Sequence, residues 1–296
     1  MPDTRLPLDA TAVASMLVLC ALWGFQQVAV KLAAHGVSLV MQGAIRSAVA
    51  LLLVVAWSRL RGIALFGRDR TLVPGLFAGL LFGTEFAMIY AGLAHTTASR
   101  MVVFLYVAPV LTALGLALLV PGERLGALQW MGIGVAFAGI AFAFREGFAV
   151  GGRATWLGDV LGLAAAFGWA ATTVLIRASA LARVRAEKTL AYQLAVSGPL
   201  MLLVSLALGE PGVVRWTPTA MASLAFQAVI VAFASYLTWF WLLTRYLAGR
   251  LAVFSFAAPL FGVAFGHLVL DEPLTPAFHV AAALVGIGIA LVNLRR

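Results

Sequence analysis

One pattern of residues occurs twice in this chain, with its two copies about 150 positions apart. The matched landmarks are Trp23 with Trp169, Lys31 with Arg177, Arg100 with Arg250, Pro109 with Pro259, Glu123 with Glu272 and Gly139 with Gly288. A nearly constant offset across so many positions indicates an internal duplication, in which each copy builds one structural unit. We therefore expect two related halves, 1–148 and 149–296.

Each half consists of long apolar runs. The runs cover 12–34, 37–57, 72–94, 98–120, 125–144, 155–177, 189–208, 217–243, 250–270 and 275–294. Of the 296 residues, 63% are hydrophobic and 10% are charged, whereas a soluble domain has about 25% charged residues. A helix needs about 20 apolar residues to cross a bilayer. We therefore predict an all-α integral membrane protein with ten transmembrane helices, five in each half.

The loops between the runs predict how the chain crosses the membrane. If the N-terminus is cytoplasmic, most of the 20 Lys and Arg residues fall in cytoplasmic loops, as the positive-inside rule requires. We therefore expect both termini in the cytoplasm. An odd number of crossings in each half makes the second half enter from the opposite face, so the halves form inverted-topology repeats. Substrate sites in such proteins lie near the bilayer midplane, between the repeats.

Several other classes of protein are disfavoured. The formal net charge of +9 could indicate nucleic acid, but the basic residues lie in loops between apolar runs. Cys20 is the only cysteine, which excludes an intrachain disulfide. The chain contains no phosphate-binding loop motif, no H-E-x-x-H motif and no convincing Ser/His/Asp set. We therefore expect no enzymatic activity, no cofactor, no bound metal and no nucleic-acid partner.

The first apolar run of each half carries a tryptophan beside hydrogen-bonding side chains. These residues are Trp23, Gln26 and Gln27 in the first half, and Trp169, Thr172 and Thr173 in the second. Residues four positions apart share one face of a helix, so Trp23 with Gln27, and Trp169 with Thr173, each offer a ring beside a polar group. Either these groups line a substrate cavity, or the polar groups bond neighbouring helices while the indoles fill packing space.

Glu85 is a carboxylate deep inside the third run, and its counterpart in the second half is Ser235. In a functional reading it recognises a substrate ammonium group or exchanges a proton, because burial disfavours its charged form. The alternative is a buried ion pair with Arg46, the one Lys or Arg residue in the interior of a run and away from its ends, that holds two helices together. The sequence leaves both interpretations open.

Further aromatic residues occur in the third, fourth, eighth and ninth runs. They are Tyr90, Tyr106, Tyr236, Trp239, Phe240 and Phe256. Tyr90 corresponds to Phe240, and Tyr106 to Phe256, so these positions are aromatic in both halves. The pattern indicates either a central chamber for flat or apolar ligands, or aromatic residues used for packing and lipid contact.

Prolines and glycines also recur at matched positions. Pro109 and Pro259 are expected in the middle of helices, where proline removes a backbone donor and kinks the helix. They serve either as bend points for gating or as static kinks. Glycines in the fifth and tenth runs predict close contact between helices: Gly132, Gly134, Gly139, Gly286 and Gly288.

The sequence resembles a known family at several of these landmarks. The residues that carry the resemblance are Ala21–Gly24 with Lys31, Gly168–Ala170 with Arg177, Tyr106–Pro109 with Glu123 and Leu125, and Phe256–Pro259 with Glu272 and Leu274. Over essentially its whole length the chain resembles the EamA-type repeats of the drug/metabolite transporter superfamily, and within it the bacterial aromatic amino acid exporters. The resemblance implies ten helices around a central cavity in the bacterial inner membrane, and export by alternating access.

The resemblance also implies which residues line that cavity: Trp23, Tyr90, Tyr106, Trp169 and Phe256. Together with the patterns above, it leads us to expect export of aromatic or other apolar amino acids. The rings of these residues and of Trp239 would contact the side chain, and Gln27, Thr173 and Glu85 the polar end. The family motifs are largely architectural and do not fix the substrate. Efflux of lipophilic or aromatic cations, with Glu85 essential, is therefore the alternative, and a membrane-embedded enzyme or sensor is the hypothesis from a different class.

We expect the protein to meet two partners, a small-molecule substrate and membrane lipid. A monomer is the simplest assembly, and a dimer stays open. The sequence does not distinguish proton coupling from facilitated diffusion.

Overall fold

The computed structural model of the protein describes residues 6, 8–65, 67, 69–93, 95–96, 98–123, 125–143, 145, 155–270 and 276–294. These residues form helices and connecting loops. Their β pairing is limited to two isolated bridges, Leu6 with Tyr246 and Val37 with Val213. The expected all-helical architecture is therefore confirmed for the part of the chain that the structure describes.

The helices follow the apolar runs closely. In chain order they are α1 (Ala10–Ala34), α2 (Leu39–Leu60), α3 (Leu72–Leu93), α4 (Ala98–Leu105), α5 (Ala108–Leu119), α6 (Ala127–Ala143), α8 (Thr155–Ala178), η1 (Ala180–Arg183), α9 (Ala186–Ala207), α10 (Pro218–Ala225), η2 (Phe226–Ser235), α11 (Tyr236–Arg245), α12 (Ala248–Phe254), α13 (Ala257–Leu270) and α14 (Pro276–Asn293). Within these residues, seven helices are long and apolar enough to cross a membrane. Three further apolar helices are shorter: Val103–Leu119, Ala127–Phe142 and His279–Asn293. The chain is therefore a multi-pass membrane protein.

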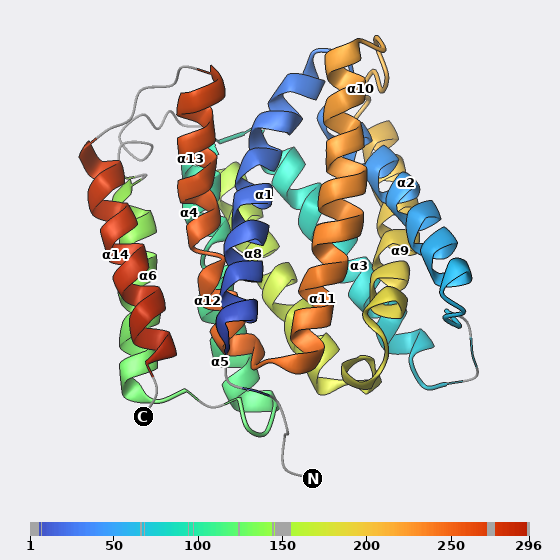
Figure 1. Ribbon diagram of the computed structural model, residues 1–296. Coiled ribbons are helices and arrows are strands. Elements are labelled where there is room, and N and C mark those ends of the chain that lie inside the picture. Colours follow the sequence, from blue (N-terminus) through green and yellow to red (C-terminus); the bar gives the residue numbers. More distant parts are fainter. Residues whose placement is uncertain are drawn as a thin grey trace.

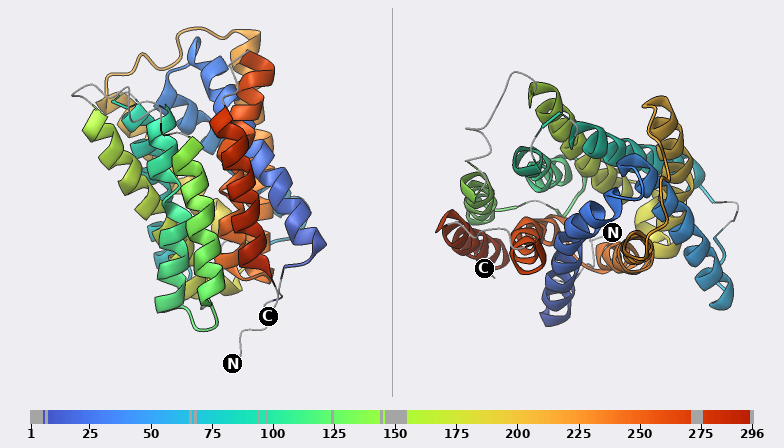
Figure 2. Two further views of the ribbon diagram at one scale, coloured as in Figure 1. Left: turned by 90° about the vertical axis from the view of Figure 1, so that its left-hand side faces the viewer. Right: turned by 90° about the horizontal axis from the view of Figure 1, so that it is seen from above.

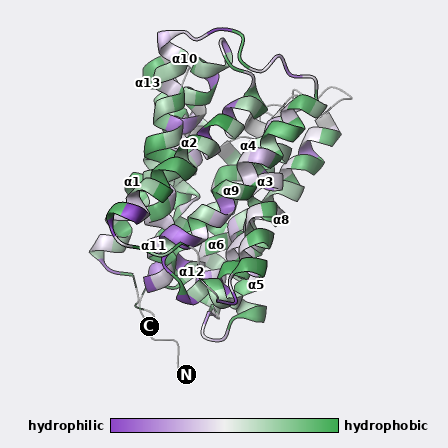
Figure 3. Cartoon of the chain, turned by 90° about the vertical axis from the view of Figure 1, so that its right-hand side faces the viewer, coloured by the Kyte–Doolittle hydropathy of each residue, from purple (hydrophilic) through white to green (hydrophobic). Residues whose placement is uncertain are grey.

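The helices pack as one bundle in which elements far apart in sequence lie side by side (Figures 1 and 2). α6 packs against α14 at one edge, and α2 packs against α9 at the opposite edge. Between these edges α3 contacts both α8 and α9, and α1 contacts α13. Most residues along the helices are hydrophobic (Figure 3), as expected of helices that cross a membrane. The start of α1 and the end of α14 lie at the same end of the bundle (Figure 1).

Polar side chains satisfy the free backbone groups at two helix starts. Asp9 caps α1, because its Oδ1 accepts a hydrogen bond of 2.8 Å from the Ala12 amide. Glu210, in a loop distant in sequence, caps α2: its carboxylate accepts hydrogen bonds from the amides of Val40 at 3.0 Å and Met41 at 3.1 Å. A carboxylate at a helix N-terminus satisfies orphan donors and complements the helix dipole. Glu210 therefore fixes the loop that precedes α10 against the start of α2.

Two spans are interrupted at matching places, and this corrects the expected position of the prolines. One break separates α4 from α5 and the other separates α12 from α13. Pro109 and Pro259 lie in the first turns of α5 and α13, not in the middle of a helix. Proline fits there because its missing N–H would have no helical partner in a first turn.

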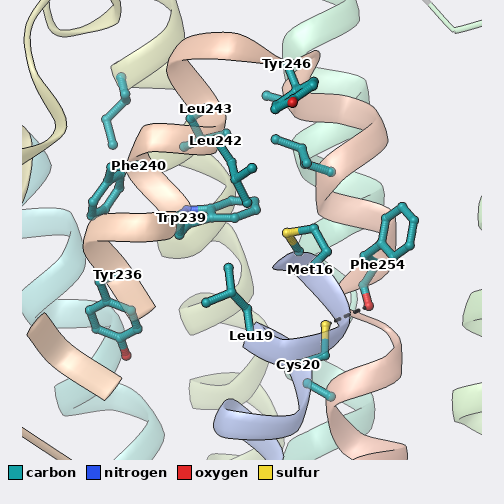
Figure 4. Packing of buried hydrophobic residues seen from close by; sticks show 14 of the residues in the cluster. Met16, Leu19, Cys20, Tyr236, Trp239, Phe240, Leu242, Leu243, Tyr246 and Phe254 are labelled. Atoms are coloured by element: carbon teal, nitrogen blue, oxygen red, sulfur yellow. Dashed lines mark hydrogen bonds between the residues drawn. The ribbon is translucent and has the colours of Figure 1, made fainter. Parts of the chain in front are cut away.

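The second break is stabilised by side chains of α1 and of the break itself (Figure 4). The amide of Ala258 donates to the Ser255 carbonyl at 2.9 Å, which leaves the Phe254 carbonyl free. The buried thiol of Cys20 donates to that carbonyl at 3.1 Å, and the Ser255 hydroxyl donates to the Ala252 carbonyl. Freed backbone groups within a membrane need such partners. Cys20 therefore ties α1 to the break.

Close contact through glycine, predicted for the fifth and tenth runs, is confirmed at some of these glycines. A Cβ on Gly132 would lie 2.7 Å from the Gly288 carbonyl oxygen, and one on Gly139 would lie 3.1 Å from the Ala281 carbonyl oxygen. At Gly134 and Gly286 a Cβ would meet no described atom within 4 Å. The contact between α6 and α14 therefore uses Gly132, Gly139 and Gly288, whereas the other two glycines face open space.

A buried ion pair joins three elements: α8, α12 and the loop after α5. Arg177, at the end of α8, donates to Glu123 in the loop after α5, with 3.1 Å between Nε and Oε1. Both side chains are only 1% exposed. Glu123 also accepts from the amides of Ala248 at 3.1 Å and Gly249 at 3.3 Å, at the start of α12. The carboxylate therefore has several donors, as a buried charge requires.

Candidate functional site

The bundle contains a partly open cavity with a volume of about 130 Å³. That space corresponds to on the order of ten water molecules. Nine aromatic rings line it: Trp23, Phe82, Phe86, Tyr90, Tyr106, Trp169, Tyr236, Trp239 and Phe240. Its polar side chains include Gln26, Glu85, Thr172, Thr173 and Gln193. Its wall therefore combines a large aromatic surface with a small set of polar groups, as small-molecule sites do.

Most of the site residues expected from the sequence are brought together here. The predicted residues that line the cavity are Trp23, Glu85, Tyr90, Tyr106, Trp169, Thr173 and Trp239. Phe256 is absent from the lining; it is fully buried, with its ring centroid 6.5 Å from that of Tyr106. The side chain of Gln27 lies outside the described residues, and its neighbour Gln26 lines the cavity.

Paired rings build the cavity wall. Trp23 of α1 meets Trp239 of α11 edge to face, with centroids 5.9 Å apart. Tyr106, in the break between α4 and α5, meets Trp169 of α8 in the same way at 5.8 Å. Edge-to-face pairs are favourable because the positive edge of one ring meets the negative face of the other. Each pair therefore joins helices that are distant in sequence.

Trp23 has a second contact, with a residue that the sequence identified only as the counterpart of Glu85. Its indole Nε1 donates to the Ser235 hydroxyl oxygen at 3.0 Å, and that hydroxyl donates to the Val231 carbonyl at 2.7 Å. Ser235 ends η2, a ten-residue π-helical segment. π-helical turns are rare and frequent at functional sites. Ser235 therefore fixes the Trp23 indole at the cavity wall.

The expected ion pair between Glu85 and Arg46 is not formed. The ion pairs within the described residues are Arg177–Glu123, Arg185–Glu187 and Lys188–Asp69. Arg46 instead places its Cζ atom 4.1 Å from the centroid of the Phe86 ring, a cation–π contact. Glu85 is its electrostatic neighbour but does not bond it. Packing against Phe86 therefore replaces the salt bridge suggested by the sequence.

Sequence reasoning missed Phe82, Phe86 and Gln193. A signal for the two phenylalanines was present, because Phe82, Glu85, Phe86 and Tyr90 recur at helical spacing along one face of α3. Gln193 is a polar residue within an apolar run, which by itself marks a candidate. It lies in α9, which supplies no residue to the repeated tryptophan pattern.

Apolar helices around a cavity with a few polar groups are typical of small-molecule transport proteins of the membrane. The chain belongs to the EamA-like transporter family, whose sequence profile matches residues 10–145 and 156–294. This membership confirms the resemblance noted from the sequence. It implies a small-molecule substrate and a lipid environment.

Relatives and a solved structure agree with this membership. An uncharacterised transporter of Bacillus subtilis (strain 168), YvbV, is 29% identical over 172 residues; this alignment covers 58% of the present chain and only about half, 55%, of that protein. A probable amino-acid metabolite efflux pump of Escherichia coli (strain K12) is 27% identical over 283 residues and covers 92% and 91% of the two chains. One crystal structure has a TM-score of 0.81 at 23% identity and covers 96% of this chain and 97% of the other, which shows a shared fold.

Proposed function

We propose that the protein exports amino acids with aromatic or other apolar side chains through its central cavity. The observation that carries the proposal is a cavity lined by aromatic rings together with a carboxylate, amide and hydroxyl groups. The rings would contact the substrate side chain, while Thr173, Glu85 and Gln27 would bind its polar end. Similar proteins named as probable amino-acid metabolite efflux pumps support this substrate class.

The proposed topology has ten spans, with the three shorter apolar helices crossing beside the seven longer ones. The halves 1–148 and 149–296 would be inverted repeats in the bacterial inner membrane. Chain direction places Arg59, Arg61, Arg183 and Arg245 at the end of the bundle where α1 begins. The positive-inside rule then puts this end, and both termini, in the cytoplasm.

Transport would proceed by alternating access without chemical conversion of the substrate. The matched breaks before Pro109 and Pro259 are the proposed hinges, because interrupted helices have fewer backbone hydrogen bonds to lose when they bend. Tyr106 lies in one break and lines the cavity, so movement there would reshape the cavity wall directly. Phe256 lies in the other break and would act through its contact with Tyr106.

Efflux of lipophilic cations is the second candidate, and the position of Glu85 on the aromatic wall favours it. Carboxylates and aromatic faces together attract organic cations. Arg46 argues against it, because this buried guanidinium is electrostatically coupled to Glu85 and would repel a cation held there.

Counterflow in liposomes tests the proposal. Liposomes preloaded with unlabelled phenylalanine should accumulate labelled phenylalanine and tryptophan, leucine less, and threonine least. Repeating the assay with a pH gradient separates proton coupling from facilitated diffusion. Two results together would favour cation efflux over amino acid export. Amino acids would show no counterflow, and labelled tetraphenylphosphonium would accumulate in liposomes with the wild type but not with Glu85→Gln.

A further inference from the structure

Arg46 is a buried cation that forms no ion pair within the described residues and has the Tyr236 side chain as a polar neighbour. The side chain is 1% exposed, and its Nε, Nη1 and Nη2 atoms have no hydrogen-bond partner among the described residues. Burying an unpaired charge is costly unless a counter-charge or hydrogen bonds compensate it. Its contact with Phe86 supplies part of that compensation. A guanidinium in this position can attract an anionic group of a bound ligand.

Two polar groups of the cavity wall without partners among the described residues lie on α9 and α3, the helices that pack against α2 and its Arg46. Ser47, next to Arg46, bonds Ser197 of α9 with 3.2 Å between their hydroxyl oxygens. Gln193 precedes Ser197 by one helical turn, on the same face of α9. It lines the cavity, is fully buried, and has no partner for its Nε2 or Oε1 among the described residues.

Tyr90 provides the second group. A Cβ on Gly43, one turn before Arg46 in α2, would lie 3.1 Å from Cε2 of Tyr90. The Tyr90 hydroxyl is buried without a partner among the described residues, and the residue lines the cavity. Tyr90 and Tyr236 are also electrostatic neighbours of Arg46. The cavity wall therefore offers two donors without partners among the described residues, the amide N–H of Gln193 and the hydroxyl of Tyr90.

We propose that Gln193 and Tyr90 bind the carboxylate of a zwitterionic substrate, with Arg46 behind them supplying the positive charge. Glu85 lines the same cavity and takes the ammonium group. Arg46 lies against Phe86, and Phe86 lines the cavity. The Arg46 charge therefore attracts the substrate carboxylate electrostatically, without direct contact. A buried cation and a carboxyl group on the wall of one cavity complement a zwitterion better than a cation. The inference rests on the proposed function, which it deepens by assigning the two charged ends of the substrate.

Three probes with the same phenyl ring test the carboxylate subsite and the ammonium subsite separately. L-phenylalanine carries both charges, 3-phenylpropionate lacks the ammonium group and 2-phenylethylamine lacks the carboxylate. Binding of each to the purified full-length protein is measured by isothermal titration calorimetry. Gln193→Leu should weaken binding of phenylalanine and 3-phenylpropionate by about tenfold or more, as loss of a hydrogen bond to a charged group does. Arg46→Met should weaken the same two probes, because it removes the positive charge behind the carboxylate. Gln193→Leu should leave 2-phenylethylamine within twofold, and Arg46→Met should leave it unchanged or strengthen it, because a repelling cation is removed. Arg59→Met, at the exposed end of α2, should change nothing.

Glu85→Gln should show the opposite selectivity, weakening the two ammonium-bearing probes and sparing 3-phenylpropionate. Gln193→Leu carries the same expectation as Arg46→Met and decides the question if the arginine variant does not fold. Equal weakening of all three probes, or of none, would overturn the carboxylate subsite, as would a wild type that binds neither carboxylate-bearing probe. Binding of 3-phenylpropionate but not phenylalanine, lost in both variants, would leave the subsite intact and reject amino acids as substrates.

Discussion

The Trp23 indole nitrogen lies 3.0 Å from the Ser235 hydroxyl oxygen, so a hydrogen bond joins α1 to the π-helical segment of another span. The counterparts of Trp23 and Ser235 in the duplicated sequence are Trp169 and Glu85. Within the described residues, no corresponding hydrogen bond joins that pair. Ser235 uses its own proton for the Val231 carbonyl, so it is available to Trp23 as an acceptor.

Removing this bond should loosen the cavity wall. Ser235→Ala leaves the indole N–H unpaired, and we expect it to cost about 1–3 kcal/mol of stability. Trp23→Phe removes the donor while keeping a ring. A double-mutant cycle, followed by thermal unfolding in detergent, should give a coupling energy of about 1 kcal/mol. Strictly additive effects would show that the bond does not contribute.

Trp169 should matter more than its surface neighbour Phe167 on the same helix. Trp169 contacts Tyr106 in the cavity wall, whereas Phe167 is 55% exposed on the bundle surface. Losing an aromatic pair costs about 0.5–1.5 kcal/mol beyond the buried area. Trp169→Ala should therefore reduce counterflow several-fold, while Phe167→Ala should leave it nearly unchanged. Equal transport by both variants, at equal insertion, would remove Trp169 from the site.

Breaking the buried pair Arg177–Glu123 should be strongly destabilising. Arg177→Leu removes the cation that pairs with this buried carboxylate, and such changes cost about 3–5 kcal/mol. Arg185→Gln is the matched control, because its ion pair with Glu187 spans 3.4 Å and the Arg185 side chain is 66% exposed. An exposed pair contributes less than about 1 kcal/mol. Similar melting temperatures for the two variants would contradict the assigned role.

Two glycines of α6 provide a further matched comparison. Gly132→Ala should lower the melting temperature, because the new Cβ would lie 2.7 Å from the backbone oxygen of Gly288. Gly134→Ala, on the same helix, places its Cβ in open space and should be neutral or slightly stabilising, since alanine is the better helix former. The reverse order would mean that α6 and α14 do not pack as described.

Acid should weaken one link between α3 and α9. Asp69, in the loop before α3, accepts from Lys188 of α9 at 2.5 Å and from the Thr71 hydroxyl. The Lys188 ammonium is the main cause that lowers the pKa of Asp69 from 3.8 to about 2. A lowered folded-state pKa stabilises the fold above the unfolded value and loses that effect as the pH falls toward about 2.

Asp69→Asn should therefore lower the melting temperature at neutral pH. The difference from wild type should shrink as the pH falls from about 4 toward about 2. Melting curves at several pH values measure it, with Asp9→Asn as a second case, since hydrogen bonding by the Ala12 amide lowers the pKa of Asp9 in the same direction. A difference that does not depend on pH would show that the Asp69 charge is not involved.

The sequence by itself determined the helices, the membrane class and much of the cavity. Apolar runs fix the helices because backbone groups in lipid must bond within their own segment. Trp23, Tyr90 and Trp169 were identifiable because polar and aromatic residues matched between the two halves, and the structure gathers them in one wall. These inferences depend only on local composition and on repetition.

Tertiary structure alone decided which apolar and charged side chains meet. Phe82 and Phe86 line the cavity while Phe256 lies behind it, although all three are phenylalanines in apolar runs. In a membrane protein the face toward lipid and the face toward packing are both apolar, so hydropathy does not distinguish them. The contact of Arg46 with Phe86 instead of Glu85 depends on how α2, α3 and α9 pack. Packing between spans, which no single run encodes, therefore sets the charge arrangement of the site.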